Sequence, residues 1–267
     1  MLLASCLLLL ASGFLLLQHI RARQAADAQW EELQTRQALR AAVDPGWQPF
    51  SFYDDTGWQG LDADLARELA RRLDLQLQPD PVGYDALYDA LSTKRDDIAL
   101  SAVVVDPARA PDFAYTVPYF DAGARLVSKR SAGIAGTGDL PGKRVAVALG
   151  SEADRVARYW ERRAAAMQRL AFPDDRGAYD AVRSGRADAA ILDALAAAQL
   201  IGEDDADADA DAEESGYASI SIEPRPYAIA VRSDHRRLLQ ALNEALHDMQ
   251  ADGTLDRLVR RWVARRS

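Results

Sequence analysis

The stretch from Asp96 to Phe120, DDIALSAVVVDPARAPDFAYTVPYF, constrains the fold of this chain more than any other. It predicts a strand from Ile98 to Val105, because an unbroken apolar run bounded by turn residues is typical of a parallel strand covered on both faces. A turn at Asp106-Pro107 follows, and then Arg109. An arginine just past the carboxyl end of such a strand lies where open α/β sheets bind ligands, and its planar fork matches a carboxylate. Taken alone, a surface arginine after a turn is the simpler interpretation.

Strand-like and helix-like segments alternate on both sides of this stretch. The β-α-β-α-β order predicts an α/β fold with a mostly parallel sheet, and the pattern restarts near residue 125, which predicts a second sheet. The strands are expected at 39–43, 75–78, 124–127, 143–149, 187–192 and 227–231, with a hairpin over 51–58. The helices are expected at 65–73, 84–91, from 150 onward, and at 178–182, 238–250 and 255–263.

The net charge of −9 comes almost wholly from one acidic run. Residues 203–214, EDDADADADAEE, hold eight acids and no base, so the rest of the chain is nearly neutral and a nucleic-acid partner has no basic domain to use. The run has nothing to bury and is expected to be a disordered, solvated insertion. Its D-x-D-x-D spacing lacks the central glycine and distal glutamate of a calcium loop, so no calcium is expected there.

The N-terminal segment is apolar and lies apart from the predicted fold. Residues 2–17 carry no charge, so residues 1–23 are expected to be a signal peptide or a membrane anchor, followed by a linker helix over 24–38. The single cysteine, Cys6, lies in this run. The folded part therefore has no disulfide and no thiol chemistry.

The sequence is poor in groups for catalysis. None of the three histidines, His19, His235 and His247, follows a strand where a catalytic base is expected, and HExxH, CxxC, P-loop and GxGxxG motifs are absent. No cofactor and no metal site is therefore expected. What remains is a set of groups at loop positions of the two predicted sheets, namely Asp44, Trp47, Tyr84 and Arg109 in the first and Gly150, Ser151, Glu152 and Asp193 in the second.

These groups suit a small zwitterion. Arg109 can hold a carboxylate in two parallel hydrogen bonds, and free N–H groups at the start of the helix after Ser151 can add donors. Asp193, just past a strand, can accept from an ammonium group. Trp47 and Tyr84 can enclose an apolar or cationic part of the ligand.

Six stretches, in this order, match a family pattern across 39–263: WQPFSFYDDTGWQGLDADLARELARRL, YDALYDALSTKRDDIAL, DPAR followed by PYF, LPGKRVAVALGSEA, AVRSGRADAAILD, and YAIAVRSDH with LLQALNEALHDMQADGTLDRLVRRW. The chain resembles the periplasmic amino-acid-binding proteins of ABC uptake systems, solute-binding family 3. The resemblance implies a two-lobed Venus-flytrap fold of the type II periplasmic-binding class. Lobe 1 would comprise 39–121 and 227–267 and lobe 2 would comprise 122–226, with crossing segments near 120–125 and 219–226. It further implies an amino-acid-like ligand, an ABC permease of the inner membrane as partner, a monomeric state and a periplasmic location.

The resemblance also gives roles to single residues. Arg109 would clamp the α-carboxylate of the ligand and Asp193 would bind its α-ammonium group. Trp47 and Tyr84 would enclose the side chain.

Further roles are implied for residues around these four. Gly150-Ser151 would add donors to the carboxylate, Asp44 would touch the distal end of the ligand, and Ser101 would offer backbone contacts. The sequence departs from the family pattern at Val104, where a hydroxyl residue is usual, and at Glu152, where threonine is usual. An added acid near a ligand carboxylate is unfavourable unless the ligand brings a positive group.

Two alternatives stay open. Some proteins of this fold resemble cyclohexadienyl or arogenate dehydratases, whose chemistry needs a general acid, and Glu152 is the candidate here. A membrane-tethered ligand sensor is the other alternative, and the N-terminal apolar run favours it.

Overall fold

The computed structural model describes residues 29–207 and 216–263. The predicted signal peptide or anchor, including its hydrophobic helix, lies outside this part of the chain. Within it, no helix is both long and apolar enough to cross a membrane.

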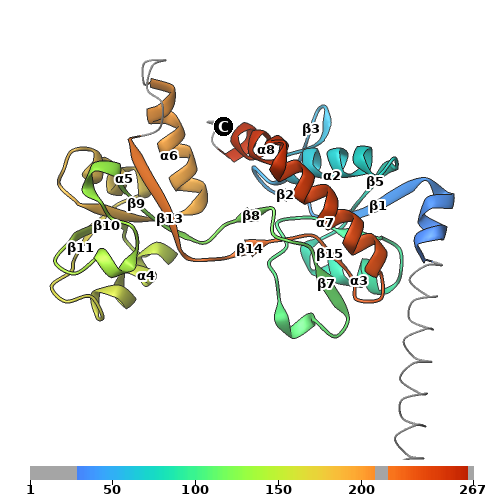
Figure 1. The fold of residues 1–267 in the computed structure, drawn as a ribbon, viewed down its shortest axis with the longest axis horizontal. Coiled ribbons are helices and arrows are strands. Elements are labelled where there is room, and N and C mark those ends of the chain that lie inside the picture. Colours follow the sequence, from blue (N-terminus) through green and yellow to red (C-terminus); the bar gives the residue numbers. More distant parts are fainter. Residues whose placement is uncertain (1–28, 208–215, 264–267) are drawn as a thin grey trace, which may run out of the picture. The chain divides into compact units, whose positions relative to one another are not determined.

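The described chain forms two compact units, one of residues 29–117 and 228–255 and the other of 118–207, 216–227 and 256–263. Figure 1 shows the course of the chain through them. Each unit contains a five-stranded sheet, ordered β5-β1-β6-β15-β7 in unit 1 and β11-β10-β12-β9-β13 in unit 2. In each sheet the fourth strand alone runs against the others, so the predicted α/β architecture with mostly parallel sheets is confirmed.

Unit 1 begins with residues 29–36, which are helical. Its strands are β1 (Ala38–Val43), β2 (Gly46–Trp47), β3 (Ser51–Asp54), β4 (Gly57–Gln59), β5 (Gln76–Pro81), β6 (Ile98–Ala99), β7 (Phe113–Tyr115) and β15 (Ala230–Arg232). Its helices are α2 (Leu61–Arg72), α3 (Leu87–Ser92) and α7 (Arg236–Ala251), with short 3-10 turns η1 (Tyr84–Ala86) and η2 (Pro107–Arg109). The last helix of the chain, α8, spans Thr254–Val263. The predicted hairpin is present, because β3 and β4 pair antiparallel.

Unit 2 repeats the alternation of strand and helix. Its strands are β8 (Phe120–Asp121), β9 (Ala124–Lys129), β10 (Arg144–Ala148), β11 (Gln168–Phe172), β12 (Ala189–Asp193), β13 (Tyr217–Glu223) and β14 (Pro226–Tyr227). Its helices are α4 (Glu152–Glu161), α5 (Asp175–Arg183) and α6 (Ala194–Asp207), with 3-10 turns η3 (Arg130–Ala132) and η4 (Thr137–Asp139). Strands β8 and β14 lie side by side as an antiparallel pair (Figure 1).

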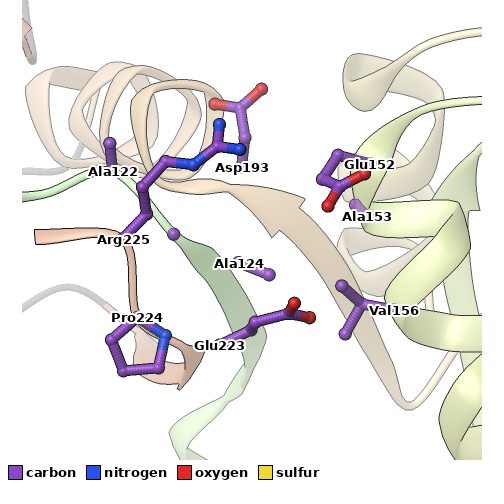
Figure 2. A pocket seen from close by; sticks show the side chains of 10 residues that line it. Ala122, Ala124, Glu152, Ala153, Val156, Asp193, Glu223, Pro224 and Arg225 are labelled. Atoms are coloured by element: carbon purple, nitrogen blue, oxygen red, sulfur yellow. The ribbon is translucent and has the colours of Figure 1, made fainter. Parts of the chain in front are cut away.

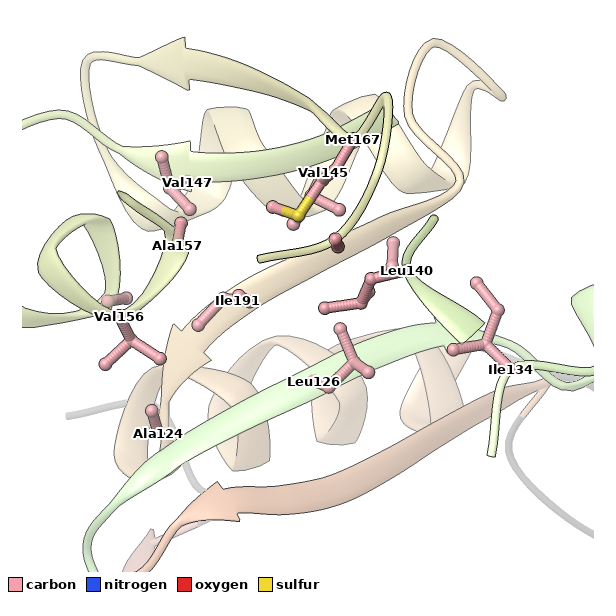
Figure 3. Packing of buried hydrophobic residues seen from close by; sticks show 13 residues of the cluster. Ala124, Leu126, Ile134, Leu140, Val145, Val147, Val156, Ala157, Met167 and Ile191 are labelled. Carbon is pink, nitrogen blue, oxygen red and sulfur yellow. The ribbon is translucent and has the colours of Figure 1, made fainter. Parts of the chain in front are cut away.

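Alternate residues of the unit 2 strands fill two separate cores. On one face, Leu126, Val145 and Ile191 pack with Val156 and Ala157 of α4, as Figure 3 shows. The opposite face packs against α5 and α6 through Val127, Ala146, Leu192, Tyr179 and Leu200. A sheet covered on both faces explains why its strands read as apolar runs rather than as alternating ones.

The strand predicted over residues 98–105 is much shorter in the structure. Strand β6 contains only Ile98 and Ala99. Ala102 has a positive φ of 47°, which no regular strand can accommodate, and its N–H donates to the buried Asp62 carboxylate at 2.8 Å. After Ala99 the chain therefore leaves the strand, with Leu100, Ala102 and Val103 buried, and continues toward Arg109.

The acidic run begins inside a helix rather than in an insertion without structure. Helix α6 continues to Asp207. Asp204 accepts a hydrogen bond of 2.8 Å from the Tyr179 hydroxyl, and Glu203 pairs with Arg176. These partners on α5 give the first acids of the run something to bind, which composition alone does not reveal. Residues 208–215 lie outside the described part.

An aspartate just before a central strand holds the same arrangement in each unit. Asp97 precedes β6 and receives the Arg40 N–H at 2.9 Å, while its own N–H donates to the Arg40 carbonyl at 3.0 Å. Asp188 precedes β12 and exchanges the same two bonds with Arg144, both at 2.8 Å. Each carboxylate also binds the guanidinium of its arginine, at 3.0 Å in unit 1 and 2.7 Å in unit 2.

Replacing Asp97 by alanine is expected to lower the free energy of unfolding of unit 1 by about 3 kcal/mol, because the loss leaves a largely buried arginine pair without its anion. The Asp97 side chain is 4% exposed, whereas that of Asp188 is 30% exposed. The matched variant Asp188→Ala should therefore cost unit 2 only about 1 kcal/mol. Urea unfolding followed by a probe in each unit measures both values, and equal costs would contradict the explanation.

Candidate functional site

Three neighbouring strands of the unit 2 sheet are each followed directly by a helix. Strands β11, β10 and β12 are parallel neighbours, so their carboxyl ends meet at one edge. Ser151 caps α4 by accepting from the Asp154 N–H at 3.1 Å, and Asp174 caps α5 by accepting from the Gly177 N–H at 2.8 Å. Asp193 accepts from the Ala196 N–H at 2.8 Å in the first turn of α6. Three helix N-termini, each with positive dipole character, are thus gathered where open sheets bind ligands.

A pocket of about 120 Å³ lies at this edge, entirely within unit 2. Figure 2 shows the carboxylates of Asp193, Glu152 and Glu223, which come from three different elements, arranged around it. The other lining residues are Ala122, Gly123, Ala124, Ala153, Val156, Pro224 and Arg225. The pocket thus combines three acids and one cation with a small apolar wall.

Gly123 lets two chain segments approach closely beneath this pocket. A Cβ atom at position 123 would lie 1.9 Å from the carbonyl oxygen of Glu223, which no side chain can tolerate. Asp121 fixes the same approach by accepting from the N–H groups of Gly123 at 3.0 Å and Arg225 at 2.8 Å. The floor of the pocket is therefore held by backbone contacts.

Arg155 links two of the acids that line the pocket. It donates to Glu152 Oε1 at 2.8 Å and to Glu223 Oε1 at 2.5 Å. The pKa of Arg155 is raised above the ordinary value of arginine, and its hydrogen bond to Glu152 is the largest cause. Glu152 is exposed and held by this bond, so the burial that a general acid requires is not present.

The free N–H groups at the start of α4 follow Ser151, whereas those of Gly150 and Ser151, which the resemblance implies as donors, are already bonded. The Gly150 N–H donates to the buried Asp154 carboxylate at 3.0 Å, and the Ser151 N–H donates to the Ala148 carbonyl at 3.2 Å. Within the described residues, no acceptor is found for the N–H groups of Glu152 and Ala153, which both line the pocket. The backbone donors left for a ligand anion, at Glu152 and Ala153, are therefore two residues further along the chain than the Gly150-Ser151 pair.

Asp175 is a charged neighbour of Asp193 that the sequence did not single out. It begins α5, is half-buried, and its Oδ1 has no hydrogen-bond partner in the described residues. Burial, and then the charges of Asp193 and Asp174, raise the pKa of Asp175 to about 6. Asp175 could have been found from strand β11, because it follows the carboxyl end of that strand. The sequence pattern did not reveal β11 as a strand.

At the carboxyl edge of the unit 1 sheet, Ser101 fastens two strand ends together. Its hydroxyl donates to the Asp44 carbonyl at 2.8 Å and accepts from the Asp44 N–H at 3.1 Å. Ser101 is buried, and Asp44 also accepts from the Gly46 N–H at 3.1 Å. Both residues thus shape the loop that carries Trp47.

Arg109 lies at the end of η2 and is positioned by an aromatic ring. Its guanidinium carbon is 4.1 Å from the centre of the Tyr88 ring, and its Nε is 3.4 Å from Asp106 Oδ2. The Tyr88 hydroxyl lies 2.9 Å from that of Tyr115, which fixes the ring. Stacking leaves the guanidinium edge available, since the Arg109 side chain is 48% exposed.

The two aromatic residues predicted to enclose a ligand are both exposed. Trp47 on β2 is 56% exposed and Tyr84 at the start of η1 is 43% exposed. Large aromatic side chains are usually buried, so this exposure is consistent with surfaces kept for a ligand.

The predicted site residues divide between the units. Asp44, Trp47, Tyr84, Ser101 and Arg109 belong to unit 1, whereas Gly150, Ser151, Glu152 and Asp193 belong to unit 2. The joint action of Arg109 and Asp193 on one ligand therefore stays a prediction. No group of three or more possible metal ligands occurs in residues 29–207 and 216–263.

Comparison with known proteins matches residues 39–265 to the family described as bacterial extracellular solute-binding proteins, family 3. The chain belongs to this family. Membership makes it an extracytoplasmic protein, and the expected fold and family are confirmed.

Relatives within family 3 include the L-cystine-binding protein TcyJ of Escherichia coli, 29% identical over 86% of this chain and 84% of that protein. The lysine/arginine/ornithine-binding periplasmic protein of E. coli is 27% identical over 85% of this chain and 87% of its own length. Among solved structures, an ancestral cationic amino acid solute-binding protein has a TM-score of 0.55 and 30% identity, covering 87% of this chain and 98% of that one. These relatives are binding proteins, although a second structure of the same ancestor describes it as a precursor of cyclohexadienyl dehydratase.

Replacing Asp175 by asparagine is expected to raise the free energy of unfolding of unit 2 by about 1 kcal/mol at pH 7.5, because a half-buried carboxylate with a raised pKa is ionised there at a cost. The gain should shrink as the pH falls through about 6, where the folded group takes up its proton, and vanish near 3.8, its value in the unfolded chain. Urea unfolding at several pH values measures this. The neighbouring Asp174→Ala is the control, which removes the N-cap acceptor of Gly177 and should instead destabilise α5. A stabilisation by Asp175→Asn that does not depend on pH would contradict the assignment.

Proposed function

We propose that this protein captures an α-amino acid outside the cytoplasm and delivers it to an ABC-type uptake system. Arg109 of unit 1 would bind the ligand carboxylate and Asp193 of unit 2 would bind its ammonium group. Trp47 and Tyr84 would contact the ligand side chain. Family membership over residues 39–265 supports the role in solute capture.

The observation that carries the proposal is the state of Asp193. It is exposed at a pocket, and the bond to Ala196 uses only its Oδ1. A carboxylate has about four acceptor positions, so Asp193 retains capacity for an ammonium group. The hydrogen bond from the Ala196 N–H fixes the orientation of the Asp193 carboxylate, and with it the orientation of the remaining acceptor positions.

Arg109 supports the proposal from the other unit. Stacking on Tyr88 holds the guanidinium plane while its edge stays exposed. An arginine in this state is prepared for two parallel hydrogen bonds to a planar carboxylate, with less loss of side-chain freedom on binding.

The acids around the unit 2 pocket favour a ligand with a second positive group. Glu152, Asp193 and Glu223 line it together with Arg225, and Arg155 offsets only part of their charge. A basic side chain would meet this demand, and so would the second ammonium group of cystine. Relatives named for lysine, arginine and ornithine, and for cystine, are consistent with this class.

The partner and location follow from the proposed role. An ABC permease of the inner membrane would receive the ligand from a monomeric binding protein on the periplasmic side. Residues 2–17 would serve as signal or anchor.

The dehydratase alternative is less well supported. Its general acid would be Glu152, and that side chain is exposed and bonded to Arg155. We therefore propose a binding protein rather than an enzyme, and incubation with prephenate or arogenate should give no product.

The Arg109→Ala variant is expected to weaken amino-acid binding by about a hundredfold, because a ligand carboxylate would lose its paired donors. Arg109→Lys should lose about tenfold, since a single ammonium cannot form the two parallel bonds. Calorimetry with arginine, lysine and cystine measures the affinities. The control is Arg71→Ala on α2, which removes an exposed arginine paired with Glu68 and should leave binding unchanged. An Arg109→Ala protein that binds as tightly as the parent would refute the proposed clamp.

The Glu152→Gln variant tests the ligand class. Binding of arginine should weaken by about fivefold, while any binding of glutamine should change little or improve, because only the former carries a second positive charge. Glu161→Gln, at the other end of the same helix, is the matched control. Equal changes for arginine and glutamine would rule out a role for Glu152 in selecting charge.

A further inference from the structure

A second pocket lies within unit 1, where residues 29–36 meet the amino ends of the central strands. It has a volume of about 60 Å³ and is lined by Gln29, Glu32, Leu33, Arg36, Arg40, Lys94, Asp97, Arg232 and His235. These residues come from the first helical segment, from β1, from the turn before β6, and from β15 and the start of α7. None of them belongs to the proposed amino-acid site.

Several buried polar atoms around this pocket have no hydrogen-bond partner among residues 29–207 and 216–263. His235 is 2% exposed, and neither of its ring nitrogens forms a hydrogen bond of normal geometry. Arg36 Nε and Gln29 Oε1 are likewise buried without a partner in the described part of the chain. Because unpaired buried polar groups are costly, their gathering around one cavity indicates a polar occupant.

The charges around the pocket favour an anion. Asp97 neutralises part of the Arg36 and Arg40 charge, at 2.6 and 3.0 Å. Asp234 lies 3.1 Å from Arg232 Nε, and Glu32 lies 3.7 Å from Arg36 Nη1. Four cationic side chains and two carboxylates thus line the pocket, and Asp234 offsets one of the cations from outside the lining.

Lys94 accounts for the excess positive charge. It is exposed at the rim, and no hydrogen bond or ion pair of its side chain is found among the described residues. Lys94, Arg36 Nε and a ring N–H of His235 supply donors from three separate segments. Such a convergence of N–H groups is typical of oxyanion sites.

The size of the pocket agrees with a tetrahedral oxyanion. One water needs about 15 Å³ of such space, so the pocket has room for about four waters or for a single anion of five heavy atoms. We infer that this pocket of unit 1 binds a tetrahedral oxyanion of the phosphate or sulfate class. Gln29 Nε2 donates to Asp234, so Gln29 Oε1, which has no partner among the described residues, is left as an acceptor for the hydroxyl of a hydrogen phosphate ion. The phosphate could come from the free ion or from a phospholipid headgroup.

His235 gives the site a dependence on pH. Burial, and then the charge of Arg232, lower the pKa of His235, while the charges of Asp97 and Asp234 and the Gln29 backbone act in the opposite direction. A bound oxyanion would favour the protonated ring, in which both nitrogens donate. Anion binding should therefore take up a proton and become tighter as the pH falls.

The test uses the full chain and inorganic sulfate, with chloride at matched ionic strength as reference. Sulfate keeps its charge between pH 5.5 and 8, so a change in its affinity reports on the protein. Calorimetry should show saturable sulfate binding in excess of chloride, at least about threefold tighter at pH 5.5 than at pH 8. His235→Gln should abolish this pH dependence, and Lys94→Gln should weaken binding by about tenfold, whereas Lys143→Gln in unit 2 should leave it unchanged.

Two further arms identify the source of the anion. Inorganic phosphate competing with sulfate would support a free anion as ligand. Binding to vesicles of phosphatidylglycerol that is inhibited by sulfate and lost in Lys94→Gln would support a lipid phosphate. The inference is overturned if sulfate binds no better than chloride, or if Lys94→Gln and Lys143→Gln behave alike.

Discussion

A carboxylate at the amino end of one central strand fixes the register of each sheet. Asp97 and Arg40 exchange backbone and side-chain hydrogen bonds in unit 1, and Asp188 and Arg144 do so in unit 2. A slip of one residue would turn every buried side chain of the strand to the wrong face, so these pairs specify the cores as well as the ends. By fixing the register, these pairs also determine where the strands end at their carboxyl ends, and therefore where the loops with the candidate ligand-binding residues begin.

The two units use their carboxyl edges differently. In unit 1 the edge offers side chains: Ser101 closes the backbone, Tyr88 supports Arg109, and the aromatic rings stay exposed. Unit 2 offers helix N-termini and acids, with Arg155 between Glu152 and Glu223. One unit thus presents mainly a cation at its carboxyl edge and the other mainly anions, a division of charge on which the proposed capture of a zwitterion depends.

Much of this could be predicted from the sequence, because buried parallel strands and amphipathic helices have strong patterns. The α/β fold, both sheets and the positions of Arg109 and Asp193 at strand or turn ends were predicted. Strand β11 was missed since its residues, QRLAF, are partly exposed and lack a clear apolar run. Asp175, which follows this strand, was not predicted as a candidate site residue either. Its raised pKa depends on burial and on Asp193, which lies in another segment. The early end of β6 depends on Asp62, 40 positions away in sequence from Ala102, and no local pattern reports such a contact.

The close approach at Gly123 has a consequence for how relatives of this protein can diverge. Since any side chain there would collide with the Glu223 carbonyl, the pocket floor cannot be reshaped by substitution at that position. Changes in the shape and charge of this pocket must arise instead at its walls, where the exposed side chains of Glu152 and Arg225 lie on a helix and in a loop. The close contact at Gly123 therefore limits variation in the shape of this pocket to the side chains of its walls.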